Sequence, residues 1–402
     1  MRFVCKIFIA LLPFLSACTM AMPTIAHPND EKFLSVSDIH FTPFASCPTI
    51  AIRPCRLITA LRQAPPQKWD ALFKKYDHQA IAGYLHDTNY ALLTSSLATV
   101  QAIGQHEKLQ FTVILGDFLA HNFRGQYIYY SHDRTAAGYR EFVKKTLQFL
   151  TMAIRDALPE GDIYPIVGNN DSYTDDYSVI ADGEFLHDTA AIWVNFIKEP
   201  QNRKNLLAMF PIGGYYAVDV PLHKKQRILV LDTVLFSSSA TGKQIAEAAQ
   251  KQLTWLHEQL LTAAKQQQSV ILAFHIPAGM NVYKTLMNLF SGIKQFWRPE
   301  YRMAFERELQ HFPHTVRAIL PGHVHIDNFP VAGLNSIANI PVIFTPSISP
   351  IFGNNPAVKV YRYDAKAFSI VDYDTYFYEL HDQTKTPPWQ QVGWAKESVT
   401  VK

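Results

Sequence analysis

The feature that most restricts the fold of this 402-residue chain is a short polar turn that follows an apolar run. Residues 111–115 are apolar and β-prone, and Gly116-Asp117 comes directly after them. A glycine lets the backbone turn sharply where a strand ends, so Asp117 is expected at the edge of a sheet. Open α/β sheets bind their ligands at that edge. The pattern therefore indicates an α/β protein with a ligand site at its strand ends.

Four further strand-like runs end in side chains that bind divalent metals. Asp38 and His40 follow the run at residues 33–37, and two residues apart in an extended segment they leave on the same side. Oxygen and nitrogen ligands together suit zinc, iron or manganese. With Asp117, the candidate metal ligands are therefore Asp38, His40, Asn169, His275, His323 and His325.

The composition is that of an ordinary globular protein, with 48% hydrophobic and 18% charged residues. The formal net charge is only +3. No nucleic-acid partner held by charge is expected, because such partners require strongly basic patches. The sequence gives no indication of the oligomeric state.

The first residues predict export. Residues 1–17 combine a basic start, Arg2 and Lys6, with an apolar core too short to span a membrane, so they are interpreted as a signal peptide. Leu15-Ser16-Ala17-Cys18 matches a bacterial lipobox, in which Cys18 is lipidated and becomes the new N-terminus. An ordinary signal cut after Ala21 or Ala26 is the alternative. The protein is expected in the periplasm or at the outer membrane, to which a lipid anchor would attach it. Secretion is the alternative location.

Residues 19–32 are interpreted as a tether, residues 33–380 as the folded domain that contains the candidate ligands, and residues 381–402 as a C-terminal tail. Cys47 and Cys55 are the two cysteines left in the exported fold. In an oxidising compartment they can close a small disulfide loop after the first strand. Two free buried thiols are the alternative.

In chain order the candidate ligands resemble those of the calcineurin-like metallophosphoesterases. The shared motifs are D-x-H at Asp38, G-D at Asp117, G-N at Asn169, a lone histidine at His275, and G-H-x-H at residues 322–325. Within that family the chain is most similar to the acid sphingomyelinase-like phosphodiesterases, through Gly116-Asp117-x-x-x-His121 and residues 345–356 and 371–376. The resemblance implies a four-layer α/β/β/α sandwich of two mixed β-sheets flanked by helices.

The resemblance also implies roles for these residues. It assigns Asp38, His40 and His325 to one metal ion and Asn169, His275 and His323 to a second, with Asp117 bridging the two. Zinc is the first expectation for both ions, and manganese and iron are alternatives. A hydroxide activated by both metals would attack phosphorus. His121 is expected to protonate the leaving group.

One position departs from the family pattern. The family often has Gly-Asn-His, and the position of that histidine is Asn170 in this chain. The amide of an asparagine donates a hydrogen bond but cannot transfer a proton. Gly-Asn-Asn-Asp resembles the form found in endopolyphosphatases. The expected activity is hydrolysis of a phosphodiester or phosphoanhydride bond in a small molecule or lipid headgroup. The alternatives are an endopolyphosphatase or phosphomonoesterase, and a non-catalytic metal-bound lipoprotein that binds a ligand or partner.

Overall fold

The computed structural model describes residues 30–174, 176–241, 244–281, 284–285, 292–327 and 340–380, and the backbone of residues 394–400. The signal peptide, the lipobox Cys18 and most of the tether lie outside these ranges. Within them, no helix combines the length and the apolar character that a membrane crossing requires.

The larger sheet has six strands in the order β10-β9-β8-β1-β2-β3. β1 is parallel to β2, and β2 is parallel to β3. The pairs β1–β8, β8–β9 and β9–β10 are antiparallel. This sheet is therefore mixed, with the three parallel strands at one side. Its strands are β1 (Asp30–Val36), β2 (Leu109–Ile114), β3 (Asp162–Pro165), β8 (Ala357–Asp364), β9 (Ile370–Tyr378) and β10 (Trp394–Thr400).

The smaller sheet has four strands in the order β4-β5-β6-β7, and only the β4–β5 contact is antiparallel. Its strands are β4 (Tyr216–Asp219), β5 (Gln226–Leu231), β6 (Ser269–Phe274) and β7 (Val316–Pro321). Alternate residues of β5 belong to two different cores. Ile228 and Val230 pack into the core shared with the larger sheet, whereas Leu229 and Leu231 pack with α8 and α10. A strand buried on both faces is the reason these runs are continuously apolar.

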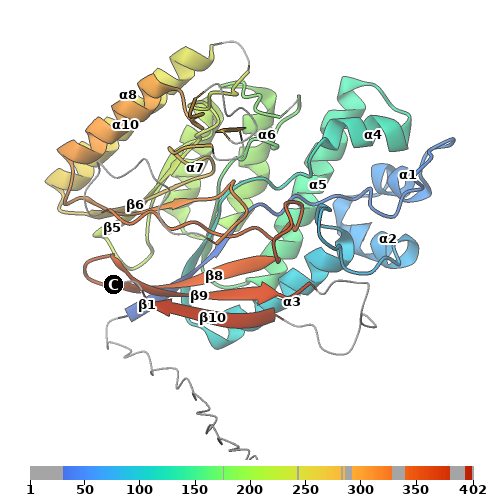
Figure 1. Ribbon diagram of the computed structural model, residues 1–402, viewed down its shortest axis with the longest axis horizontal. Coiled ribbons are helices and arrows are strands. Elements are labelled where there is room, and N and C mark those ends of the chain that lie inside the picture. The colour runs from blue at the N-terminus through green and yellow to red at the C-terminus, as the bar shows by residue number, and fades with distance from the viewer. Residues whose placement is uncertain are drawn as a thin grey trace, which may run out of the picture.

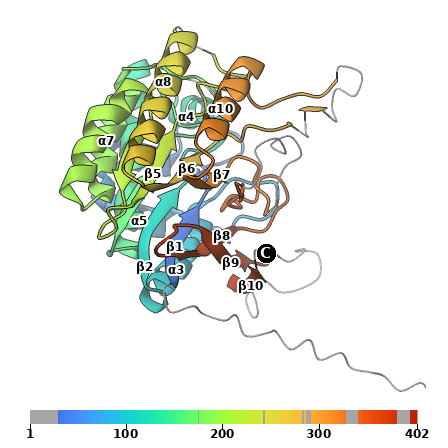
Figure 2. The same cartoon turned by 90° about the vertical axis from the view of Figure 1, so that its left-hand side faces the viewer.

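Helices complete the outer layers. α8 (Ile245–Lys265) and α10 (Pro299–His311) lie side by side over the smaller sheet (Figures 1 and 2). The helices between β2 and β4 contact one another in succession, and their buried side chains join the larger core. The remaining helices are α1 (Arg56–Gln63), η1 (Pro66–Lys68), α2 (Trp69–Tyr76), α3 (Tyr90–His106), α4 (Phe123–Ser131), α5 (Ala136–Ala157), α6 (Glu184–Trp193), η2 (Val194–Phe196) and α7 (Pro200–Gly213). Two mixed sheets flanked by helices confirm the predicted sandwich.

Two strands of the larger sheet extend past the domain boundaries predicted from the sequence. β1 begins at Asp30, inside the predicted tether, because Asp30, Glu31 and Lys32 pair with β8 although they are polar and only half-buried. β10 pairs with β9 over residues 394–400, inside the predicted tail. Backbone pairing between strands does not require apolar side chains, so hydrophobicity alone misses these residues.

Candidate functional site

Five strand ends bring the candidate ligands together. Asp38 and His40 follow β1, Asp117 follows β2, and Asn169 follows β3 in the larger sheet. The smaller sheet contributes the other three ligands, His275 after β6, and His323 and His325 after β7. The site therefore lies where the carboxyl ends of the two sheets meet. All seven residues that the sequence singled out as ligands are placed in this one region.

The backbone at these strand ends is unusual. Five ligand residues other than glycine have positive φ angles: Asp38 (50°), His40 (45°), Asp117 (54°), His323 (71°) and His325 (61°). Left-handed backbone at such residues costs on the order of 1–3 kcal/mol each and persists only where the surrounding structure enforces it. The strain is concentrated where the side chains must converge.

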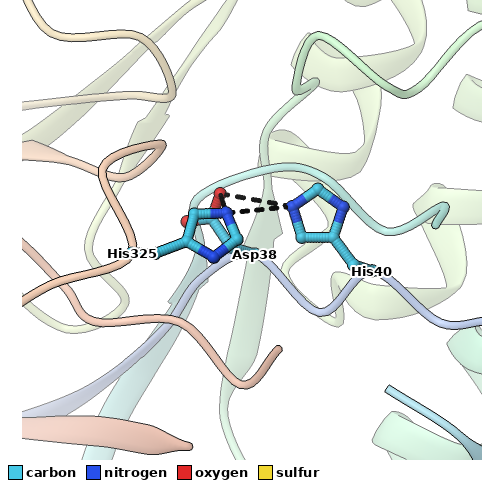
Figure 3. A group of neighbouring side chains, drawn as sticks. All are labelled: Asp38, His40 and His325. Carbon is cyan, nitrogen blue, oxygen red and sulfur yellow. Dashed lines mark hydrogen bonds and ion pairs between the residues drawn. The ribbon is translucent and has the colours of Figure 1, made fainter. Parts of the chain in front are cut away.

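The first cluster contains Asp38, His40 and His325, all buried (Figure 3). His325 Nε2 lies 3.3 Å from Asp38 Oδ1 and 3.2 Å from His40 Nε2. His40 Nε2 lies 3.7 Å from the same carboxylate oxygen. Two imidazole nitrogens and one carboxylate oxygen thus point at a common centre.

The second cluster contains Asn169, His275 and His323, and Asp117 lies with the two histidines. His275 Nε2 lies 3.0 Å from Asn169 Oδ1 and 3.3 Å from His323 Nδ1. Asn169 donates its amide to Asp176 Oδ1 at 2.7 Å, which turns its carbonyl oxygen toward His275. This set again offers oxygen and nitrogen donors to one centre.

Asp117 lies between the two clusters. Its Oδ2 is 3.4 Å from His40 Nε2 and 3.2 Å from His275 Nε2. Asn170 holds the carboxylate from the other side, with its backbone N–H 2.8 Å from Oδ1 and its side-chain amide 2.9 Å from Oδ2. The position suits a bridging ligand.

Three observations indicate that these clusters are suited to bind metal ions. His40 Nδ1 and His275 Nδ1 contact the carbonyl oxygens of Leu119 and Leu115, at 3.1 and 2.6 Å, and such contacts leave Nε2 free for a metal. His323 Nε2 contacts Tyr177 Oη at 3.3 Å, so its Nδ1 faces the centre. Asp38 Oδ1 is buried with no hydrogen-bond partner in the described structure. Oxygen and nitrogen donors of this kind suit divalent cations.

The two buried carboxylates of the site favour positive charge on two of its four histidines, whereas burial lowers the pKa of the other two. Burial alone would raise the pKa of Asp38, but His325 and His275 hold it well below its usual range. Burial would lower the pKa of His40, yet Asp117 raises it to about 9. His275, equally buried, is raised to about 10 by Asp117 and Asp38. Two buried carboxylates require a compensating cation, and divalent ions supply that charge.

The sequence did not predict Asp87 as a site residue, but its carboxylate fixes the position of His121 through two hydrogen bonds. Its Oδ1 lies 2.9 Å from His121 Nδ1, and its Oδ2 accepts the backbone N–H of His121 at 3.0 Å. Burial would raise the pKa of Asp87, whereas His121 and His40 lower it. An ionised carboxylate only accepts, so His121 Nδ1 is the donor and Nε2 remains for proton exchange. The His121 ring stacks on His40 at 4.1 Å.

Asp171 is a second residue at the site that the sequence motifs do not indicate. It is buried and accepts the backbone N–H groups of Phe118 and Leu119 with Oδ1, at 2.9 and 3.1 Å. Its Oδ2 accepts the N–H of Gly168 at 3.0 Å. Asp171 therefore ties the loop after β2 to the loop after β3. Burial, and then the charge of Asp117, raise its pKa to about 7.

Gly168 allows these two loops to approach each other. A Cβ at this position would lie 2.1 Å from Asp117 Oδ1 and 2.2 Å from the Asp117 nitrogen. A Gly168→Ala variant must displace Asp117, and a shift of about 1 Å near reacting groups costs on the order of 10²-fold in rate. Steady-state kinetics should show that loss. Gly104→Ala in α3, where the added Cβ meets only a Leu158 side-chain methyl at 3.1 Å, is the control and should retain activity. Equal activity of both variants would contradict the expectation.

The other predicted residues are two that lie at the site, two cysteines that lie away from it, and Cys18. Cys47 and Cys55 are joined in a disulfide within the loop between β1 and α1. Asn170 lies at the site, bonded to Asp117, and His121 lies beside His40 with a third of its side chain exposed. Cys18, the proposed lipidation site, lies outside the described residues.

Comparison with known proteins agrees with this geometry. Residues 31–327 match the calcineurin-like phosphoesterase family. A sphingomyelinase phosphodiesterase C from Dictyostelium discoideum is 24% identical over 390 residues, which cover 94% of this chain and 78% of that protein. A human acid sphingomyelinase-like phosphodiesterase 3b is 25% identical, with 91% and 75% of the two chains covered.

A cyclic GMP-AMP phosphodiesterase from Bos taurus is 23% identical, and the match covers 74% of this chain and 62% of that protein. These relatives confirm the predicted resemblance to the acid sphingomyelinase-like phosphodiesterases. The matched region contains every candidate metal ligand, and the clusters support divalent metal ions as the cofactor. The chain belongs to the calcineurin-like phosphoesterase family and is a phosphoesterase.

Proposed function

We propose that this chain is a phosphodiesterase that carries two divalent metal ions and releases an uncharged alcohol. The observation that carries the proposal is the Asp87–His121 pair, stacked against the ligand His40. A general acid is needed most when the leaving group is a poor one such as an alkoxide. A residue held in this way indicates a substrate whose leaving oxygen must be protonated.

The residues divide the task between them. One ion would be held by Asp38, His40 and His325. The other ion would be held by Asn169, His275 and His323, and Asp117 would bind both ions. When bound, such ions polarise a phosphoryl group and lower the pKa of water. His121 donates a proton to the leaving oxygen from Nε2, while Asp87 fixes the tautomer. Asn170 supplies a hydrogen bond without a proton.

A cavity of about 840 Å³ adjoins Asp87 and supports this choice of leaving group. Phe44, Tyr84 and Tyr130 give it aromatic walls, and Gln126 lines it with an amide. Neither lysine nor arginine lines it among the described residues. An anionic leaving group such as a polyphosphate would find no lysine or arginine there and would face the Asp87 carboxylate. An uncharged alcohol meets no such repulsion.

The second candidate is hydrolysis of a phosphoanhydride, as in an endopolyphosphatase. Asn170 favours it, because anhydrides need little protonation of the leaving group. The names of the relatives favour the diester, since they describe phosphodiesterases that act on a sphingolipid or a cyclic dinucleotide. A phosphomonoesterase activity has no separate observation in its favour, and family membership disfavours a non-catalytic lipoprotein.

Export, the lipid anchor at Cys18 and zinc are parts of the same proposal. The basic start, apolar core and lipobox of residues 1–18 support export and lipidation. The Cys47–Cys55 disulfide suits an oxidising compartment. Four of the seven candidate ligands are imidazoles, which zinc binds well.

The experiment is turnover by the purified chain starting at Thr19, with Zn²⁺ or Mn²⁺ added. Bis-p-nitrophenyl phosphate and sphingomyelin in micelles represent diesters, and ATP and polyphosphate represent anhydrides. Diester hydrolysis should exceed anhydride hydrolysis, and EDTA should abolish it until metal is restored. Preference for ATP or polyphosphate would establish the second candidate. Absence of turnover on all four substrates with either metal would contradict both.

A further inference from the structure

The loop between β1 and α1 carries the most exposed pair of neighbouring aliphatic side chains in the described structure. Cys47 and Cys55 close it with a disulfide, eight residues apart. Ile50 is 73% exposed and Ile52 is 84% exposed. Single exposed apolar residues are common on protein surfaces, but two at the tip of a cross-linked loop are a local apolar surface. We call residues 47–55 the disulfide loop.

The disulfide loop is held firmly on the end of α4. Tyr129 Oη accepts the Ala51 N–H and donates to the Thr49 carbonyl, both at 3.1 Å. The Ala51 carbonyl contacts His132 Nε2 at 2.9 Å. The backbone at the centre of the loop is therefore turned inward, while the side chains on either side of Ala51 remain in water. A loop fixed in this way loses little conformational entropy on binding.

The shape of the loop suits a flat partner. The segment that leads into α1 projects beyond both α1 and α4 (Figure 1). Stable protein interfaces bury roughly 800 Å² on each partner, far more than two isoleucine side chains provide. A lipid surface has no such requirement, because apolar side chains enter the headgroup boundary one at a time and charges add to them.

Positive charges accompany the two isoleucines. Arg53 lies in the loop and Arg56 begins α1, and both are exposed. Within the described residues neither arginine has an ion pair to an acidic side chain. Near an anionic bilayer each such charge contributes about 1 kcal/mol, or roughly a fivefold gain in binding. Exposed aliphatic side chains with adjacent unpaired arginines are complementary to anionic lipid.

We propose that the disulfide loop is a membrane-docking tip that inserts Ile50 and Ile52 into the surface of an anionic bilayer. This contact is separate from any lipid at Cys18 and does not depend on the proposed reaction. α4 connects the tip to the site, since its nine residues begin just after His121 and end beside the loop. A helix of that length spans about 13 Å, so docking would hold the site close to the lipid surface.

Vesicle co-sedimentation tests the proposal. The chain starting at Thr19 keeps every described residue and lacks the lipidation site, so it isolates the loop. Vesicles of phosphatidylglycerol and phosphatidylcholine in equal parts should bind it, and pure phosphatidylcholine vesicles should bind it less. Ile50→Ser and Ile52→Ser should each weaken binding about tenfold, from the lost apolar burial. Arg53→Gln with Arg56→Gln should remove most of the preference for anionic vesicles.

Leu222→Ser is the matched control, because Leu222 is 95% exposed but lies in the turn between β4 and β5. It should bind vesicles as the unsubstituted chain does. Thermal unfolding should be unchanged in all three serine variants, since each side chain is already in water. Vesicle binding that Ile50→Ser and Ile52→Ser leave intact would overturn the proposal. A lack of binding to anionic vesicles would overturn it as well. This includes the case in which Ile50→Ser and Ile52→Ser abolish self-association of the chain instead.

Discussion

Asp117→Asn is expected to reduce turnover on the order of 10⁴-fold while the protein remains folded. Asp117 Oδ2 is the carboxylate oxygen that lies within 3.5 Å of both His40 Nε2 and His275 Nε2. Asparagine preserves the shape but removes the negative charge that would bind both ions, and losing several kcal/mol of transition-state stabilisation has this effect on rate. Metal content, measured by mass spectrometry, should fall together with the rate of diester hydrolysis.

Asp162→Asn is the control for loss of a buried carboxylate. Asp162 is also buried, but it lies at the start of β3, where it accepts the backbone N–H groups of Lys198 and Glu199. This variant should lose stability and keep its metal and its kcat. The assignment of Asp117 as the shared ligand would be wrong if Asp117→Asn retained full activity.

His121→Ala is expected to slow substrates with poor leaving groups about 10³-fold and p-nitrophenyl esters far less. General acid catalysis contributes on the order of 10² to 10⁴-fold, and its contribution shrinks as the leaving oxygen becomes more acidic. The measurement is kcat/KM for a p-nitrophenyl diester and for an alkyl diester such as sphingomyelin. The ratio of the two losses, rather than either loss alone, reports proton donation.

Asp87→Asn should reproduce part of that leaving-group dependence. The amide can still contact His121, but it no longer fixes the tautomer through the 2.9 Å contact to Nδ1. A merely structural role for Asp87 would slow both esters equally. If His121→Ala also slowed both esters equally, His121 would not be the acid.

Much of the site could be predicted because its residues end apolar runs. The strand-like run that ends at His275 is β6, and the run that ends at Gly322-His323 is β7. A strand buried on both faces leaves a plain apolar pattern, and the polar side chain that follows it is conspicuous. The glycines at 116, 168 and 322 mark the same points.

Asp87 could not be found in this way. It lies in an irregular segment before α3 and reaches the site because Phe41 and Thr88 pair across the fold. No periodic pattern in the neighbouring residues indicates that pairing. The positive φ angles of Asp38 and His323 were equally hidden, since only a small fraction of aspartates and histidines adopt that conformation. Tertiary contacts impose both features.

The order of strands in the larger sheet determines when this protein can fold. β1 is made first, but its partner on one side is β8, with Leu34 opposite Val360. At roughly 5 to 20 residues per second, β1 waits on the order of 15 to 65 seconds for that neighbour to be synthesised. During this time an apolar strand has one open edge, which other chains can pair with. Until residues 357–364 have joined the sheet, a chain of this protein is therefore open to pairing with another chain along β1.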